Sequence, residues 1–196
     1  MIIGLIGEIG AGKTEFCNFM SKYLDDSSVT IHNFSDPLKQ FAMSIGFRYN
    51  EVYGTQAEKL AVNPQWGISG REFMQKFGTD LCRVQLGAVI PAMNLSGNSL
   101  WVETVRHKLE SVPVNSLVIV GDCRFADEVK LIHDLGGVVI KITRPGGHDN
   151  TAAAHVSETG IAQLPHDFLI ENNSSLVDYH VEILRAWSNC SRVGDR

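Results

Sequence analysis

The sequence lacks closely spaced cysteines, an excess of basic residues and a long apolar run. Its four cysteines form no C-x-x-C pair, so neither a zinc site nor a disulfide framework is indicated. Lysine and arginine number 17 against 22 acidic residues, and the net charge of -5 argues against a nucleic-acid polymer as the main partner. No stretch reaches the ~20 apolar residues of a membrane span. We therefore expect a cytoplasmic protein that keeps its thiols reduced and binds no membrane.

The sequence does contain enough apolar residues for one buried core, at 44% of 196 residues. Short apolar runs alternate with segments of helical periodicity. The expected strands are 2–6, 29–34, 117–120, 138–142 and 168–170. The expected helices are 13–24, one that begins at 35–37, 71–86, 100–109, 126–135 and 175–187. This alternation predicts a single α/β domain of three layers over residues 1–196, with a central parallel sheet and helices on both faces.

Two stretches interrupt the alternation. Residues 48–70 show little periodicity and contain three glycines and a proline, so we expect an irregular, exposed segment. Residues 144–164 are rich in glycine, small residues and polar residues, a composition that suits a mobile flap.

A glycine-rich motif, G-x-x-x-x-G-K-[ST], is complete between Gly7 and Thr14. Glycines let backbone N–H groups turn around an anion, and the following helix adds its N-terminal dipole. Lys13 can reach the β and γ phosphates, and the hydroxyl of Thr14 suits Mg²⁺. Because the motif follows an expected strand and opens an expected helix, we interpret it as a site for ATP with Mg²⁺. The predicted ATP-binding residues of this stretch are Gly7, Ile9, Gly10, Ala11, Gly12, Lys13, Thr14 and Glu15.

A second group of candidates lies in VGDCRF, where Asp122 and Arg124 follow an expected strand. Side chains two residues apart on extended backbone point the same way, so both should face the crevice at the carboxyl ends of the strands. The carboxylate could order magnesium-bound water, and the guanidinium could bind an acceptor phosphate through two hydrogen bonds. A surface ion pair is the alternative interpretation.

The stretch FSDPLKQ places Asp36 after another expected strand. Its carboxylate could accept a hydrogen bond from an acceptor hydroxyl, or it could simply cap the helix that follows. Both interpretations stay open. Lys39 in the same stretch is a further acceptor-side candidate.

Cationic and aromatic side chains complete the candidates. Arg144 directly follows a strand and would neutralise the transferring phosphoryl group from the flap, where Glu158 is a weaker acceptor-side candidate. Arg71 and Arg83 share one expected helix and could contact acceptor phosphate, although ordinary exposed helix charges explain either of them singly. Trp101 could stack on a base, although most aromatic residues lie in the core.

Taken together, these pieces resemble the deoxynucleoside monophosphate kinases of tailed bacteriophages and related viruses, which belong to the phosphate-loop nucleoside monophosphate kinases. The matching stretches run in order over most of the chain, and they are GEIGAGKTEF, FSDPLKQ, GREFMQKFGTDLCR, VGDCRFADEV, VVIKITRPG and HVSETG. The phosphate loop is common to many families, whereas D-x-R-F-x-D-E and R-P followed by H-x-S-E are more particular.

The resemblance implies that the γ-phosphoryl group of ATP passes to a deoxynucleoside monophosphate. It implies an acceptor-binding insertion at about 45–100, a lid at about 144–164 and often a homodimer. It supports four catalytic assignments: Lys13 on ATP, Asp36 and Arg124 on the acceptor side, and Arg144 on the lid. The resemblance also supports Thr14 on magnesium.

Two other functions stay open. One is a kinase for another small phosphorylated metabolite, such as dephospho-coenzyme A or phosphomevalonate. The other is a switch protein that binds ATP without transferring its phosphate. A small GTPase is not indicated, because the N-K-x-D guanine reader is missing.

Overall fold

The computed structural model describes residues 1–25, 28–93, 95, 99–113, 116–145 and 160–193. These residues form two compact units, which are described separately. The first unit comprises Met1–Asn33 and Lys108–Arg196, and the second comprises Phe34–His107. Among the described residues, no helix is both long enough and apolar enough to cross a membrane.

The first unit is built on a five-stranded sheet in the order β2-β5-β1-β6-β7, and all its neighbouring strands are parallel. Its strands are β1 (Ile2–Ile6), β2 (Val29–His32), β5 (Leu117–Cys123), β6 (Val138–Thr143) and β7 (Phe168–Glu171). β1 lies at the centre between β5 and β6, so the loop after it emerges at the carboxyl edge of the sheet. The apolar runs in the sequence predict all five strands, and β5 extends three residues beyond its expected end at residue 120.

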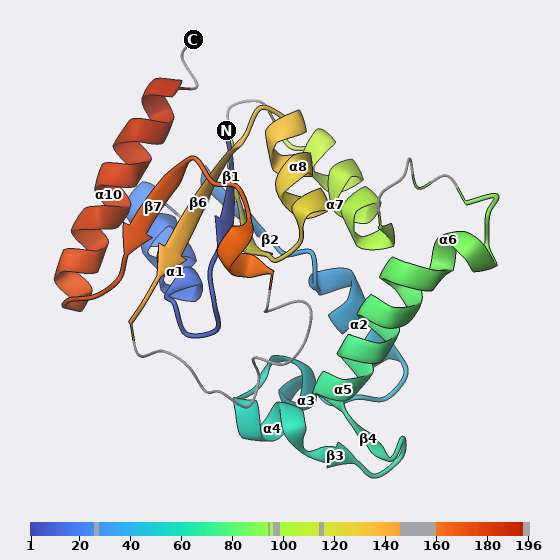
Figure 1. Cartoon of the computed structure of the whole chain (residues 1–196). Coiled ribbons are helices and arrows are strands. Elements are labelled where there is room, and N and C mark those ends of the chain that lie inside the picture. The colour runs from blue at the N-terminus through green and yellow to red at the C-terminus, as the bar shows by residue number, and fades with distance from the viewer. Residues whose placement is uncertain (26–27, 94, 96–98, 114–115, 146–159, 194–196) are drawn as a thin grey trace. The chain divides into compact units, whose positions relative to one another are not determined.

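Helices cover both faces of this sheet (Figure 1). On one face lie α1 (Lys13–Leu24) and α10 (Leu176–Val193), which share a buried core with Ile3 and Leu5 of β1. On the other face lies α8 (Ala126–Asp134), whose Ile132 packs so closely on Gly4 that a Cβ there would lie 3.0 Å from it. A short 3-10 helix, Ile161–Gln163, precedes β7. The three-layer fold with a parallel sheet is therefore confirmed.

The second unit is mostly helical. Its elements are α2 (Asp36–Ser44), α3 (Tyr49–Tyr53), α4 (Gln56–Leu60), the antiparallel hairpin β3 (Val62–Asn63) and β4 (Ile68–Ser69), α5 (Gly70–Gln75), a π-helix (Lys76–Gln85) and α6 (Leu86–Val89). Helix α7 (Leu100–Glu110) begins in this unit. The unit contains the whole range 45–100 that the resemblance marks as an insertion.

The expectation that residues 48–70 are irregular was wrong. Short helices and the hairpin occupy most of the stretch, and a buried polar centre holds them together. The carboxylate of Glu51, which is 5% exposed, accepts hydrogen bonds from the Arg48 backbone N–H (2.7 Å) and from Asn63 Nδ2 (2.8 Å). The Asn63 carbonyl oxygen in turn accepts from the backbone N–H groups of Gln65 and Trp66. Side-chain hydrogen bonds thus stabilise these short elements, and such bonds leave no periodic pattern in the sequence.

The helix expected at 71–86 is also more complex than its pattern indicates. Only its start is an α-helix, and the ten residues Lys76–Gln85 form a π-helix, a rare geometry in which each N–H bonds five residues back. Near its start the Gly78 carbonyl accepts the indole N–H of Trp101 (2.8 Å), and a Cβ on Gly78 would lie 2.4 Å from Leu38 Cδ2. Arg71 and Arg83, which were expected on one helix, therefore lie on consecutive segments of different helical geometry.

Replacing Glu51 should destabilise the protein. We expect Glu51→Ala to lower the free energy of unfolding by about 1–3 kcal/mol at pH 7, because buried donors lose their acceptor. The hydrogen bond from the Arg48 N–H, helped by Asn63 and opposed by burial, lowers the pKa of Glu51. A lowered folded-state pKa stabilises the fold above the ordinary glutamate pKa, and this stabilisation is lost as the pH falls through the folded value.

Thermal or urea unfolding should be measured for wild type and Glu51→Ala from pH 7 to pH 3. The difference between their free energies of unfolding should become smaller as the pH falls. The matched control is Glu72→Ala, because Glu72 is exposed on α5. Equal stability of Glu51→Ala and Glu72→Ala at pH 7 would contradict the prediction.

Candidate active site

The loop between β1 and α1 has the backbone shape of an anion site. Gly7 and Gly12 adopt φ values of +156° and +117°, which residues with a Cβ rarely adopt. At Gly7 a Cβ would lie 2.4 Å from the carbonyl oxygen of Ile142 on β6, so the first glycine also lets the loop approach the neighbouring strand. The loop ends at the N-terminus of the 12-residue helix α1, whose dipole favours a negative charge there.

The side chain of Lys13 lies over this loop, and its ammonium group contacts the loop backbone. Its Nζ donates to the carbonyl oxygens of Gly7 (2.6 Å) and Glu8 (2.9 Å). The ammonium group is thus held above the concave side of the loop, where it can attract phosphate oxygens. Thr14 follows it in the first turn of α1 with an exposed side chain.

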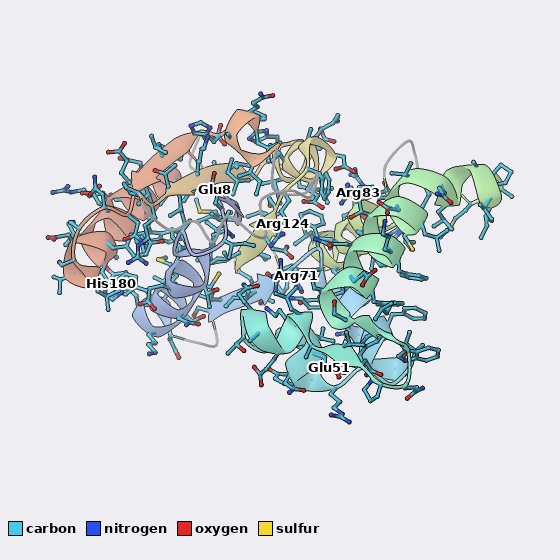
Figure 2. The ribbon with its side chains drawn as sticks, turned by 60° about the horizontal axis from the view of Figure 1, so that its bottom comes forward. Glu8, Glu51, Arg71, Arg83, Arg124 and His180 are labelled. Carbon is cyan, nitrogen blue, oxygen red and sulfur yellow. The ribbon has the colours of Figure 1, made fainter. Side chains whose placement is uncertain are left out.

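Three side chains, one directly after β7 and two on α10, hold the loop and the start of α1 in place. Asn172 Nδ2 donates to the Ala11 carbonyl (2.9 Å), and the Tyr179 hydroxyl donates to the Gly12 carbonyl (3.0 Å). His180, which is labelled in Figure 2, lies with its Nε2 2.8 Å from the Glu15 carboxylate. Its ring is stacked on that of Phe19. The side chain predicted to bind ATP at position 15 is therefore engaged by α10.

Asp122 lies at the carboxyl end of β5, beside the strand that leads into the loop. The register that pairs Ile6 of β1 with Cys123 places it there. Burial raises the pKa of the Cys17 thiol on α1 to about 12, and the charge of Asp122 adds to this rise while that of Lys13 opposes it. Asp122 and Lys13 therefore both lie near the Cys17 thiol.

Arg124 follows in the turn between β5 and α8. The Glu128 carboxylate, 2% exposed, accepts hydrogen bonds from the backbone N–H groups of Arg124 (2.7 Å) and Phe125 (3.2 Å). This contact fixes the backbone from which the guanidinium extends (Figure 2). It also gives a structural reason for the glutamate in D-x-R-F-x-D-E, because the carboxylate caps α8 and anchors the arginine turn together.

A pocket of about 360 Å³ adjoins the loop. One wall is the loop itself, and the others come from the ends of β6 and β7 and from the 3-10 helix. Its lining residues are Gly7, Glu8, Ile9, Ala11, Lys141, Ile142, Thr143, Arg144, Pro145, Ile161, Ala162, Glu171 and Asn173. Arg144 is exposed at its rim, whereas Glu158 and most of the expected lid fall outside the described residues.

The second unit carries the other candidates. Asp36 is the first residue of α2, and the cap position belongs to Ser35. Burial and then the charge of Asp36 raise the pKa of Tyr53, and Lys39 Nζ lies 4.7 Å from the centre of the same ring. Asp36 and Lys39 therefore lie close to one aromatic side chain.

Arg71 has an unusual environment in this unit (Figure 2). One of its terminal nitrogens donates to Gln56 Oε1, whereas its Nε is buried and has no hydrogen-bond partner among the described residues. Arg83 is half-buried within the π-helix. Trp101 is only 7% exposed and packs with Leu38, so its ring is part of the core and offers little surface for stacking on a base.

Sequence reasoning missed the residues that support the loop from outside. Asn172 and Tyr179 are 161 and 167 residues away from the carbonyls they bind, so no local spacing indicates them. Their setting, NNSSLVDYH after an apolar strand, looks like an ordinary helix start. Glu128, in contrast, stands in a motif that the sequence does single out.

A phosphate loop on the central strand of a parallel sheet, with an acid at the end of the neighbouring strand, defines a phosphate-loop kinase fold. The shikimate kinase of Aquifex aeolicus shares this fold, with a TM-score of 0.50, 14% identity and 96% of each chain covered. Thymidylate kinase from Ehrlichia chaffeensis matches with a TM-score of 0.46 and 15% identity, over 95% of this chain and 98% of the other.

The sequence profile of the deoxynucleotide monophosphate kinase family matches residues 7–183. A protein of Acanthamoeba polyphaga mimivirus, whose own assignment as a deoxynucleotide monophosphate kinase is a proposal, is 30% identical over 201 residues, which cover 98% of this chain and 99% of that one. The chain therefore belongs to the deoxynucleotide monophosphate kinase family and is a phosphotransferase that acts on nucleotides. The family resemblance expected from the sequence is confirmed.

Gly12, the second glycine of the G-x-x-x-x-G-K-[ST] motif, should be essential for nucleotide binding. A Cβ on Gly12 would lie 2.7 Å from Asn172 Nδ2 and 3.0 Å from the Tyr179 hydroxyl, and a φ of +117° is strained for alanine. Strain of this kind costs about 1–3 kcal/mol, so we expect Gly12→Ala to weaken triphosphate binding roughly tenfold or more in calorimetry.

The matched control is Gly136→Ala, where φ is +71° and no atom lies within 4 Å of the added Cβ. This control carries the backbone strain without disturbing the loop. Equal triphosphate affinity of both variants and wild type would contradict a binding role for the loop geometry.

Proposed function

We propose that this chain transfers the γ-phosphoryl group of ATP to deoxynucleoside monophosphates, with Mg²⁺ as the metal. The observation that carries the proposal is the closed glycine loop with Lys13 folded over its carbonyl groups. In phosphoryl transfer the protein chiefly positions phosphates and neutralises their charge, and this loop supplies both. Cytoplasmic location and a homodimer stay predictions.

The pocket beside the loop suits the nucleoside of ATP. Its loop wall is continuous with the phosphate site, so a nucleoside there would extend its phosphates toward Lys13. Ile9 and Ile161 offer apolar surface to a base, and Glu171 and Asn173 supply hydrogen-bonding groups. Arg144 at the rim is then placed to pair with phosphate oxygens.

Thr14 and Asp122 would hold Mg²⁺. Both offer oxygen atoms, which Mg²⁺ prefers, and the charge of Asp122 is near enough to Cys17 of α1 to help raise the pKa of that thiol, which supports the assignment. Among the described residues no cluster of three acidic, histidine or cysteine side chains forms a metal cage. This fits a metal that keeps waters and phosphate oxygens as most of its ligands. When bound, Mg²⁺ would neutralise charge on the β and γ phosphates.

The candidate acceptor-binding residue of the first unit is Arg124, and those of the second unit are Asp36, Lys39, Arg71 and Arg83. Arg71 has the strongest individual support. A buried guanidinium nitrogen without a partner is costly, and a phosphate oxygen would satisfy it. Arg124 is supported by the anchored backbone that orients it.

Release of ADP in a coupled assay, with a panel of acceptors, tests the function. We expect ADP to form with deoxynucleoside monophosphates and not with dephospho-coenzyme A or phosphomevalonate. The variant Lys13→Met should lower kcat roughly 10²-fold or more at an almost unchanged melting temperature, because an electrostatic contact of the transition state is lost. ATP binding without ADP release for any acceptor would favour a switch protein instead.

Arg71 should act on the acceptor alone. We expect Arg71→Met to raise the KM for the deoxynucleoside monophosphate about tenfold or more, because a charge-assisted hydrogen bond contributes roughly 1.5–3 kcal/mol. The KM for ATP should stay within about twofold of the wild-type value.

The control for this prediction is Arg185→Met, since Arg185 is an exposed arginine on α10 that forms an ion pair with Glu182 of its own helix. Should Arg71→Met change the melting temperature but neither KM, the arginine would have a structural role in the second unit.

A further inference from the structure

Two side chains donate hydrogen bonds to backbone carbonyls of the phosphate loop. One directly follows β7, and the other is on α10. Asn172, 8% exposed, donates through Nδ2 to the Ala11 carbonyl, and Tyr179, 2% exposed, donates through its hydroxyl to the Gly12 carbonyl. These carbonyls belong to consecutive peptide units of the loop. Neither side chain belongs to the glycine-lysine motif.

The geometry of the peptide unit links these contacts to the phosphate. In a trans peptide the C=O and the following N–H point in opposite directions, and the described chain has no cis peptide. Because the Ala11 carbonyl points toward Asn172, the N–H of the same peptide unit, which belongs to Gly12, points away from β7. In the same way, the bond from Tyr179 turns the N–H of Lys13 away from α10. Backbone N–H groups of this loop are the donors that cradle a phosphate.

We propose that Asn172 and Tyr179 are positioning residues for phosphoryl transfer, which aim the backbone N–H groups of Gly12 and Lys13 at the nucleotide phosphates. This inference rests on one part of the proposed function, namely that the loop binds phosphate. It does not depend on transfer to an acceptor. Neither residue touches the nucleotide itself, so each acts through the loop backbone.

The two donors are themselves fixed. The backbone N–H of Asn172 donates to the Thr143 carbonyl (2.7 Å), which continues the pairing of β7 with β6. The N–H of Tyr179 donates to the Ser175 carbonyl in the first turn of α10. Burial raises the pKa of Tyr179, so its hydroxyl keeps its proton and remains a donor. The loop is thus aligned by the sheet and α10.

The test measures phosphate binding separately from catalysis. Tyr179→Phe removes one hydroxyl and keeps the ring, and Asn172→Leu removes the amide donor at similar volume. The probe is inorganic tripolyphosphate with Mg²⁺, which has no base and reports on the loop alone. We expect calorimetry to show a Kd raised about fivefold for Tyr179→Phe, the factor for one neutral hydrogen bond, and at least as much for Asn172→Leu.

The matched control distinguishes loss of the hydrogen bond to the loop from a general destabilisation of the packing of α10. Ile183→Val lies one turn further along this helix, fully buried in the same core and without a bond to the loop. It should lower the melting temperature about as much as Tyr179→Phe and leave the tripolyphosphate Kd within twofold of wild type. For the same reason kcat with ATP should fall in Tyr179→Phe and not in Ile183→Val, while the KM of the acceptor is unchanged in both.

Unchanged tripolyphosphate binding in Tyr179→Phe would overturn the inference, and so would an equal loss in Ile183→Val. If Asn172→Leu does not fold, the comparison of Tyr179→Phe with Ile183→Val still decides the question. Tripolyphosphate binding by wild type without acceptor-dependent ADP release would overturn the proposed kinase activity and leave the positioning role standing. A wild-type protein that binds neither tripolyphosphate nor ATP would overturn both.

Discussion

The parallel pairing of β1 with β5 on one side and β6 on the other is the constraint on which the first unit depends. It places three strand ends at one edge of the sheet, and each carries a candidate group: the glycine loop after β1, Asp122 at the end of β5, and Arg144 after β6. Parallel strands align their carboxyl ends because each crossover returns the chain to the opposite edge. Residues more than a hundred positions apart in sequence thereby meet without any local signal that joins them.

Much of this architecture could be predicted from the sequence, because central parallel strands are buried on both faces. Buried strands appear as unbroken apolar runs, and the five runs of the first unit are all strands. The phosphate loop could be predicted for a different reason. Its glycines are required by backbone φ and by close approach, and its lysine and threonine have fixed offsets, so the local sequence contains the whole motif.

The second unit was harder to predict because its order comes from particular side-chain contacts. The buried pair of Glu51 and Asn63 stabilises a stretch without periodicity, and only the capping pair of Thr55 and Glu58 gave a local signal that a helix begins there. The π-helix depends on contacts that no residue spacing reveals. Trp101 illustrates the same limit, since composition cannot distinguish a tryptophan open to a base from one that donates to a buried carbonyl.

The support of the loop by Asn172 and Tyr179 has a consequence for how the site comes into being during synthesis. The glycine loop is synthesised first, and the two side chains that donate to its carbonyls follow more than 160 residues later. The strands β5 and β6, between which β1 pairs, also follow more than a hundred residues after β1. A nascent chain therefore contains the complete glycine-lysine motif before it contains the side chains that hold the loop. The loop gains these two hydrogen bonds only after the residues that follow β7 and those of α10 have been synthesised.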